Sequence, residues 1–421
     1  MTQIKLRRDT HANWATANSV LAQGEPAVDT TNLGIKIGDG TTAWTDLQYL
    51  TGGQPTPNIE YTGVFGGLPY YWRYTGAPTK LQYTSNGAFS SLGSSYYWLD
   101  QHFDDGDYDL SGLTSIRFTN IGGIKGYFDF SAKSEVVMNT LDMGEISFID
   151  GWFNFAGFSN TLTTFAANNL SQVSDGFTIY GNSFDNAPTM HFPALQRVGG
   201  QFYIDWNWNS MANTAAPTFP MLEHVGSDMY IYYNRFTSWS EFTNLQTLQW
   251  SLQFYENTNN ESAPYSFPGM PALTRMNNSM FIYSNQYMTT IPDFTSLHRI
   301  GGDIRIYYNP DLTAFPQFPT LSYCANIYCE NNPVMTTVGT SFLPTVLWVD
   351  GEVNFRNCAL DEASIDKILV RLASLDGTNG TTTYQYRNIY LDGGSNAIPS
   401  STGQDAITTL QGRGCNVYVN S

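Results

Sequence analysis

A repeated spacing of apolar residues runs through the middle of the chain. Counted from the apolar residue that opens each unit, apolar side chains recur at offsets 3, 7 and 9, and an asparagine follows at offset 12. Six consecutive units share this spacing and open 23 to 28 residues apart, at Leu170, Leu195, Leu222, Leu245, Leu273 and Leu297. Self-similarity at such a period indicates a solenoid, in which each repeat forms one coil of a stack.

The offsets within one unit predict a strand with two different faces. Offsets 7 and 9 are two residues apart and always apolar, so they point to the core, whereas offsets 8 and 10 point outward. The asparagine follows the strand, where its amide can bond backbone groups that the turn would otherwise leave unpaired. We therefore expect a stacked ladder made of Asn182, Asn207, Asn234, Asn257, Asn285 and Asn309.

Weaker copies flank the six units. Two open upstream at Ile121 and Ile146, Leu321 to Asn331 reads as a unit shortened by two residues, and Val346 to Cys358 closes the array. An apolar opening residue, an apolar-x-apolar strand and then Asn or Cys resemble the leucine-rich repeat, in its irregular bacterial and viral type. The resemblance covers residues 113–358, although the leading leucine lies seven residues before the strand and a Gly-Gly or Gly-Ser pair often intervenes.

Residues 359–421 have a different pattern. "DEASIDKILVRLASL" places apolar residues at helical spacing and offers Asp361 as N-cap. "NIYLDGG" predicts a strand, "AITTLQGRG" a short helix ending at glycine, and "CNVYVN" a last strand. This segment resembles the C-terminal part of repeat proteins encoded by bacteriophages, and we expect it to cover the open end of the solenoid core.

Residues 1–50 predict a small α+β unit. "IKLRR" is a candidate strand, "THANWATANSVL" a candidate helix with Thr10 as N-cap, and "GEPAV" and "LGIKIGDG" two strands around a turn. The stretches "IKLRR", "WATANSVLAQGEPAVD" and "IKIGDGTTAWTDLQYL" resemble the N-terminal domain of the phage major tropism determinant. The resemblance implies trimerisation and attachment to the virion, with the distal part of the chain meeting the host. Residues 51–112 combine a turn-rich linker with short aromatic strands whose fold the pattern does not define.

Composition narrows the classes of partner. The net charge of −17 argues against nucleic acid, which needs a basic footprint, and against an anionic membrane surface. No window is long and apolar enough to span a bilayer, and the N-terminus lacks the apolar run of a signal peptide. We therefore expect synthesis in the host cytoplasm and no membrane insertion.

Candidate chemistry is sparse. The four cysteines lack metal-ligand spacing and are expected to be free structural thiols, and no cofactor motif is present. Asp104 to Asp109 place four carboxylates in a glycine-containing loop, which fits either a solvated acidic turn or a calcium site, and we favour the turn. No catalytic constellation supports an enzyme, so we expect none, and no metal.

The outward strand face carries most of the remaining signal. Stacked coils lie about 4.8 Å apart, so its side chains should form continuous aromatic rows. The predicted receptor-binding residues are Tyr203, Trp206, Tyr230, Tyr232, Tyr255, Phe281, Tyr283, Arg305, Tyr307 and Tyr308. Tyrosine combines an apolar ring with a hydroxyl and suits a glycan or protein receptor. The same rows could instead lie between subunits of a trimer, or stabilise the sheet without binding anything.

The fold class expected from these patterns is mainly β: a small N-terminal α+β fibre-attachment module, a leucine-rich-repeat-like β-solenoid and a C-terminal α/β cap. The expected function is that of a bacteriophage tail fibre in the virion, a homotrimer held to other tail proteins through residues 1–50 and adhering to a host surface receptor. Alternatives are a head or baseplate fibre without a receptor role, a bacterial repeat adhesin and a capsule depolymerase.

Overall fold

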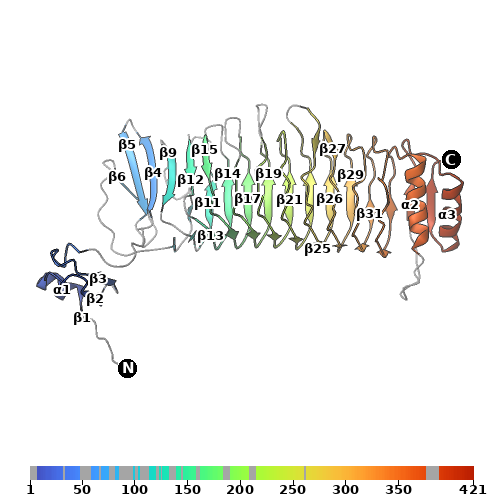
Figure 1. The fold of residues 1–421 in the computed structure, drawn as a ribbon. Coiled ribbons are helices and arrows are strands. Elements are labelled where there is room, and N and C mark those ends of the chain that lie inside the picture. Colours follow the sequence, from blue (N-terminus) through green and yellow to red (C-terminus); the bar gives the residue numbers. More distant parts are fainter. Residues whose placement is uncertain are drawn as a thin grey trace, which may run out of the picture.

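The computed structural model describes residues 7–31, 34–47, 126–131, 139–143, 146–157, 162–183, 190–207, 215–259, 262–375 and 388–421, together with the backbone of the strands between residues 58 and 124. The predicted calcium candidate Asp104 to Asp109 lies, except for the backbone of Asp104, outside the described residues. The predicted fold class is confirmed: the chain is mainly β, with a small α+β module at one end and helices at the other (Figure 1).

The N-terminal module packs one helix against three strands. Helix α1 (His11–Ala17) begins at Thr10, whose side chain accepts a hydrogen bond from the Asn13 backbone N–H, as expected for an N-cap. Strands β1 (Arg7–Asp9), β2 (Pro26–Asp29) and β3 (Gly34–Ile37) form one sheet, parallel between β1 and β2 and antiparallel between β2 and β3. Trp14 and Trp44 stack with ring centroids 4.4 Å apart and form the centre of the module's core.

The solenoid contains two long parallel sheets, and each coil before the C-terminal helices contributes one strand to both. The broad sheet consists of β8 (Phe103–Asp104), β11 (Phe128–Ser131), β14 (Phe153–Ala156), β17 (Phe177–Tyr180), β19 (Phe202–Asp205), β21 (Met229–Tyr232), β23 (Leu252–Tyr255), β26 (Met280–Tyr283), β29 (Ile304–Tyr307), β31 (Ile327–Tyr328), β33 (Val353–Asn354), β34 (Asn388–Leu391) and β35 (Asn416–Val419). It contains the strand that the sequence predicts at offsets 7 to 10. Its strands are the long arrows along the solenoid in Figure 1.

The second sheet was not predicted. This narrow sheet consists of two-residue strands at offsets 2 and 3: β7 (Trp98–Leu99), β10 (Gly123–Ile124), β13 (Phe148–Ile149), β16 (Gln172–Val173), β18 (Arg197–Val198), β20 (His224–Val225), β22 (Thr247–Leu248), β25 (Arg275–Met276), β28 (Arg299–Ile300), β30 (Tyr323–Cys324) and β32 (Trp348–Val349). Two residues are too few to show an alternating pattern in the sequence. It follows one edge of the solenoid, where β13 and β25 are labelled in Figure 1.

A third sheet lies at the N-terminal end of the solenoid. It runs in the order β15 (Thr164–Ala166), β12 (Thr140–Asp142), β9 (Leu113–Thr119), β4 (Asn58–Phe65), β5 (Leu68–Tyr74) and β6 (Leu81–Thr84). Its strands pair in parallel from β15 to β9 and antiparallel from β9 to β6. It thus joins the region that had no predicted fold to the first coils. A two-stranded sheet, β24 (Tyr265–Ser266) with β27 (Met288–Thr290), lies on the return leg.

The core fills the space between the sheets and the return leg. Opening residues and offsets 3, 7 and 9 are buried throughout the six central units. Phe177 stacks on Phe153 and on Phe202, and its edge contacts Phe192 and Phe219 from the return leg. Each coil thus adds its apolar residues to one continuous core, which explains why the spacing repeats so strictly.

Glycines between the two sheets permit close stacking of coils. A Cβ atom on Gly199, Gly226 or Gly301 would lie 2.0 Å from a carbonyl oxygen of the preceding coil. The Gly-Gly and Gly-Ser pairs of the sequence therefore mark places where the backbone of one coil contacts that of the next. The stretch from Leu321 to its broad-sheet strand is one residue shorter than the equivalent stretch from Leu297, rather than the predicted two, because Ile327 pairs with Ile304.

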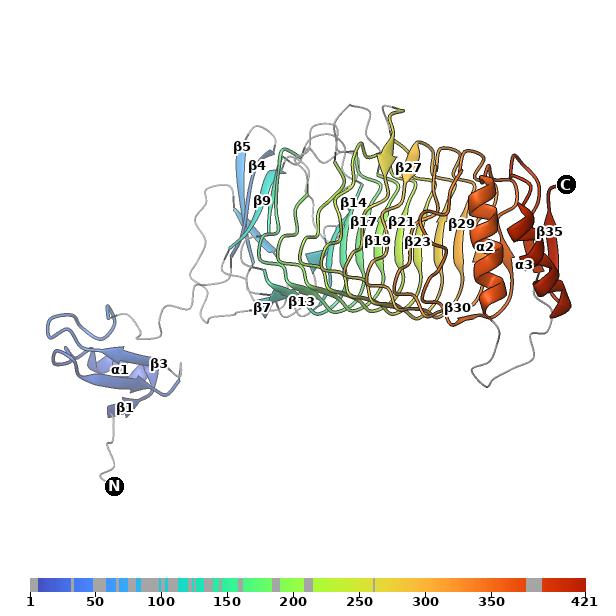
Figure 2. The ribbon, with the colours of Figure 1, turned by 45° about the vertical axis from the view of Figure 1, so that its right-hand side comes forward.

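The C-terminal elements agree with the sequence prediction. Helix α2 (Glu362–Ser374) begins at Asp361, whose carboxylate accepts a hydrogen bond from the Ser364 N–H, and helix α3 (Ser401–Gly412) begins at Ser400. Both helices bury one apolar side against the last coils. Strands β34 and β35 continue the broad sheet beside them (Figure 2).

Candidate functional site

A buried asparagine ladder holds the corner after each broad-sheet strand. In all of the six predicted asparagines except Asn182, which is the first, the Oδ1 atom accepts from the backbone N–H of the preceding asparagine, as from Asn234 to Asn257 at 3.2 Å. Each Nδ2 atom also donates to a strand carbonyl one coil away, as from Asn257 to Ile231 at 2.9 Å. The ladder residues are Asn182, Asn207, Asn234, Asn257, Asn285 and Asn309, all completely buried.

The ladder continues beyond the predicted residues. Asn332, not Asn331, occupies the next position, since its Oδ1 atom accepts from the Asn309 N–H at 3.0 Å. Cys358 takes the position after that and donates from Sγ to the Cys329 carbonyl at 3.1 Å. Burial raises the pKa of the Cys358 thiol to about 12, so the thiol stays protonated and acts as a donor.

Four tyrosines at offset 10 form one continuous stack. Rings of Tyr232, Tyr255, Tyr283 and Tyr307 lie 4.7, 4.7 and 4.9 Å apart and within 5° of parallel. Each inner ring therefore has its faces covered by neighbouring rings, and only ring edges and hydroxyl groups point outward. Burial raises the pKa of these tyrosines, that of Tyr255 to about 12, so the row is neutral at physiological pH.

Asp205 occupies the same row one coil before Tyr232. Its side chain is only 6% exposed, although it lies on the outward side of the strand. Burial raises the pKa of this carboxyl group to about 6, while a hydrogen bond with the Tyr232 hydroxyl acts in the opposite direction. A buried acid at the end of the tyrosine stack is a feature that composition alone could not indicate.

The row at offset 8 contains both aromatic rings and an arginine. Tyr203 and Tyr230 stack at 4.7 Å. Arg305 lies over the ring of Tyr328 at 4.4 Å and that of Phe281 at 5.7 Å, and its guanidinium pairs with Asp303 at 2.7 Å. Arg305 is thus held inside the surface layer by two rings and a carboxylate.

A third row, at the corner after each strand, is the most exposed. Trp206, Tyr233 and Tyr308 at offset 11 have 40%, 36% and 56% of their surface exposed. All three have a positive φ, between 53° and 55°, the left-handed region that L-residues with a Cβ seldom adopt. We call these three residues the aromatic corner.

Every described coil has the same corner geometry. Equivalent positions are left-handed at Gly157, Gly181, Glu256, Ser284, Asn331 and Asn357. The terminal coils thus use glycine or asparagine, for which this geometry costs little, whereas the central coils use other residues. The aromatic residues at offset 11 were predicted from the sequence, whereas the left-handed backbone there was not, although the glycines and asparagines at this offset in the terminal coils indicate it.

Contacts within the aromatic corner fix its orientation. Trp206 and Tyr233 lie 5.0 Å apart with their rings inclined by 43°, and Tyr233 contacts Tyr232 edge-on. The Tyr233 hydroxyl hydrogen-bonds Glu256, which raises the pKa of that tyrosine. Of the predicted receptor-binding residues, those at offsets 8 and 10 therefore lie in packed rows, whereas Trp206 and Tyr308 belong to the aromatic corner and present exposed rings, as does Tyr233.

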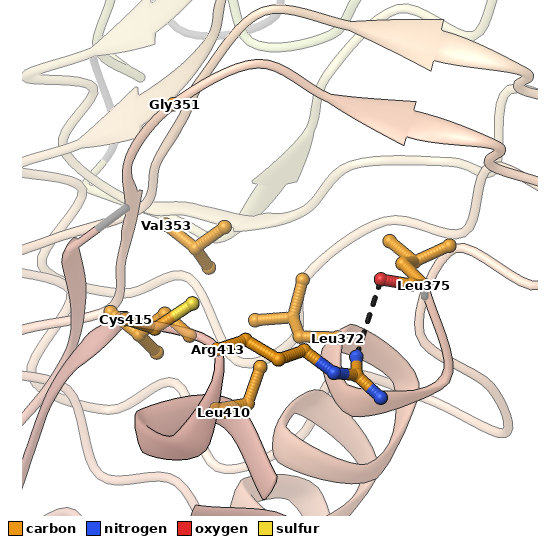
Figure 3. A pocket seen from close by; sticks show the side chains of 8 residues that line it. Gly351, Val353, Leu372, Leu375, Leu410, Arg413 and Cys415 are labelled. Atoms are coloured by element: carbon orange, nitrogen blue, oxygen red, sulfur yellow. Dashed lines mark hydrogen bonds between the residues drawn. The ribbon is translucent and has the colours of Figure 1, made fainter. Parts of the chain in front are cut away.

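The described residues offer little else for a ligand. A cavity of about 10 Å³, room for about one water molecule, lies among Val353, Leu372, Leu410 and Cys415 (Figure 3). Arg413 crosses it and donates to the Ala373 and Leu375 carbonyls at 2.7 and 3.4 Å, so it caps the C-terminal end of α2. Among the described residues no group of acids, histidines and cysteines could hold a metal ion, and no helix could cross a membrane.

Comparison with known families identifies the first module. Residues 4–42 match the family described as the major tropism determinant N-terminal domain. No curated protein and no solved structure matched the chain. The resemblance predicted for the N-terminal unit is thus confirmed over these residues, whereas the leucine-rich-repeat identity stays a prediction. The chain carries a major tropism determinant N-terminal domain followed by a parallel β-solenoid with C-terminal helices.

Proposed function

We propose that the protein is a bacteriophage tail fibre that adheres to the host cell surface through the outward face of the broad sheet. The match of residues 4–42 supports a phage tropism protein, in which residues 1–50 hold the chain on the virion tail. Adhesion is non-covalent and involves no catalysis. The solenoid type that fits the repeat best is the leucine-rich repeat.

The aromatic corner carries the adhesive contact. The observation that supports this contact is the exposure of Trp206, Tyr233 and Tyr308 in a backbone geometry that glycine would adopt at lower cost. Exposed indole and phenol rings give a ligand apolar area together with hydrogen-bonding groups, which suits a sugar ring or a protein side chain. The stacked tyrosines behind it keep the corner rigid, so little entropy is lost on binding.

The proposed assembly is a homotrimer, which the N-terminal domain would hold. Three copies convert weak single contacts into avidity. Light scattering of the purified protein should give three times the chain mass of 47.0 kDa. A monomer in solution would contradict this part of the proposal.

The left-handed backbone of the corner permits substitutions that remove the aromatic rings without destabilising the fold, so a loss of binding can be assigned to the rings themselves. The variant Trp206→Gly/Tyr233→Gly/Tyr308→Gly removes three rings at positions where glycine is favoured, so its stability should equal or exceed that of the wild type. The matched control is Ser284→Gly/Asn331→Gly, at the same corner but without aromatic rings. Fluorescently labelled protein is incubated with a panel of bacterial strains and bound protein is measured by flow cytometry.

The expected result is binding of the wild type and the control to a subset of strains, and loss of binding by the triple variant. Equal binding by all three proteins would refute adhesion through the corner and move the contact to the loops or the C-terminal helices. Failure of the wild type to bind any strain would favour a head or baseplate fibre without a receptor role.

A further inference from the structure

The narrow sheet carries two adjacent arginines. Arg275 in β25 and Arg299 in β28 occupy paired positions in neighbouring parallel strands, and both side chains are exposed. Neighbouring strands are about 4.8 Å apart, so two like charges lie side by side on one face. Like charges in directly facing positions destabilise a sheet unless something compensates for them.

Neither arginine has a carboxylate partner among the described residues. Ion pairs there involve Arg7, Arg305 and Arg356, but not Arg275 or Arg299. This is unexpected in a chain with 36 acidic and only 19 basic residues, where carboxylates are abundant. The pair therefore keeps its positive charge without a direct counter-ion among the described residues of an acidic protein.

Both guanidinium groups are nevertheless held in place. Arg275 donates from Nε to Asn277 Oδ1 at 2.7 Å, and the Asn277 amide in turn donates to Gln249 Oε1 at 2.8 Å. Arg299 lies over the ring of Tyr323 at 4.6 Å, and the Tyr323 hydroxyl is fixed by Asp350 at 2.6 Å. These contacts use the Nε atom of one arginine and the flat face of the other. The terminal N–H groups of both make no hydrogen bond to a side chain in the described part of the chain.

We propose that Arg275 and Arg299 form a binding site for the oxyanion of an acidic sugar. Arginine N–H groups match the two oxygens of a carboxylate or phosphate in a bidentate arrangement, and two arginines one coil apart can share one such group. Gln249 and Asn277 supply amides beside them for sugar hydroxyls, and Trp250, next to Gln249 in the chain, is 55% exposed and offers a ring face. A long polyanion such as nucleic acid is disfavoured by the net charge of −17.

This site is separate from the aromatic corner and does not rest on the proposed function. Arg275 and Arg299 belong to the narrow sheet, whereas the corner follows the strands of the broad sheet. If the protein is an adhesin, the site adds a charge-selective contact. If it is not, the site still binds acidic sugars.

Saturation-transfer NMR on the full chain tests the site with defined probes. The probes are glucuronic acid, glucose 6-phosphate and, as neutral control, glucose. We expect transfer to one or both acidic sugars and none to glucose, with weaker binding at 500 mM than at 50 mM NaCl because the contact is ionic. A response only to glucuronic acid identifies a carboxylate site, and one only to glucose 6-phosphate a phosphate site.

Variants locate the site. Arg275→Ala/Arg299→Ala should weaken binding at least tenfold, and Arg275→Lys/Arg299→Lys should also weaken it, because lysine lacks the bidentate geometry. Arg197→Ala is the matched control, since this exposed arginine lies in the same row three coils away, beyond the reach of a monosaccharide. Unchanged binding by the double alanine variant, equal response to glucose, or an equal loss in Arg197→Ala would overturn the proposal. The triple glycine variant of the aromatic corner should retain acidic-sugar binding, so the two proposals fail independently.

Discussion

The asparagine ladder makes a strong prediction about stability. Asn257→Ala removes four hydrogen bonds: the Oδ1 atom accepts from the Asn234 N–H and amide, and the Nδ2 atom donates to the Ile231 carbonyl and to Asn285. The Asn234 amide keeps its bonds to the Ile204 and Tyr232 carbonyls, so it is not orphaned. The substitution therefore leaves two backbone groups without these partners, the N–H of Asn234 and the carbonyl of Ile231.

The size of the effect follows from those two groups. An uncompensated buried polar group costs about 1–3 kcal/mol, so Asn257→Ala should lower the free energy of unfolding by about 4 kcal/mol. Asn257→Cys should cost less, because the thiol can donate to the Ile231 carbonyl as Cys358 donates to Cys329. The control is Asn244→Ala, an exposed site with a backbone contact only to Pro220, where a loss of about 1 kcal/mol or less is expected.

Urea denaturation followed by tryptophan fluorescence and far-ultraviolet circular dichroism measures these differences. The expected order of stability is wild type, Asn244→Ala, Asn257→Cys and Asn257→Ala. A value for Asn257→Ala within about 1 kcal/mol of that for Asn244→Ala would refute the reasoning. The corner would then be held by the strands and the core, and the ladder would be a consequence of stacking rather than a cause of it.

Two further substitutions test the outward face and the coil spacing. The pKa of Asp205 is raised in the folded state to about 6, so its contribution to stability is complete below pH 4 and is lost as the pH rises to about 6. Asp205→Asn should remove this pH dependence of stability, which is worth up to roughly 3 kcal/mol. Melting temperatures of the variant that stay parallel to those of the wild type from pH 4 to 8 would contradict this prediction. Gly301→Ala should destabilise the protein by about 1–3 kcal/mol, because its Cβ atom would meet the Asn277 carbonyl. The control Gly176→Ala, whose Cβ would have no atom closer than 3.5 Å, should be neutral or slightly stabilising. Equal unfolding midpoints for the two variants would show that the coils can separate freely.

Much of the fold could be predicted because each coil repeats the same requirements. Offsets 7 and 9 had to be apolar in every unit, and the N-cap of α2 at Asp361 follows from one short polar side chain before a helical pattern. The narrow sheet escaped prediction because a two-residue strand has no period. The pairing of its strands depends on the stacking of coils, and no single unit of the sequence determines that stacking.

The aromatic face could be predicted only in part. Its residues were identified from the strand alternation, but the sequence does not state how the rings meet. Stacking of Tyr232, Tyr255, Tyr283 and Tyr307 depends on register between coils and on shared side-chain rotamers. These contacts cover the ring faces that were expected to meet a ligand. The exposed rings are those of the corner, where Trp206 and Tyr308 were also predicted, and their orientation follows from a left-handed backbone.

The corner connects energetic cost with candidate function. A residue with a Cβ in the left-handed region costs about 1 kcal/mol or more relative to glycine, and the terminal coils avoid that cost at Gly157, Gly181 and the corner asparagines. Glu256 also adopts the left-handed backbone, and its carboxylate hydrogen-bonds the Tyr233 hydroxyl. The strained central positions therefore include a connected set, with Trp206 against Tyr233 and Tyr233 bonded to Glu256. Strain that recurs where side chains are exposed and mutually positioned is what a binding surface requires, whereas sheet stabilisation alone would be served equally well by glycine.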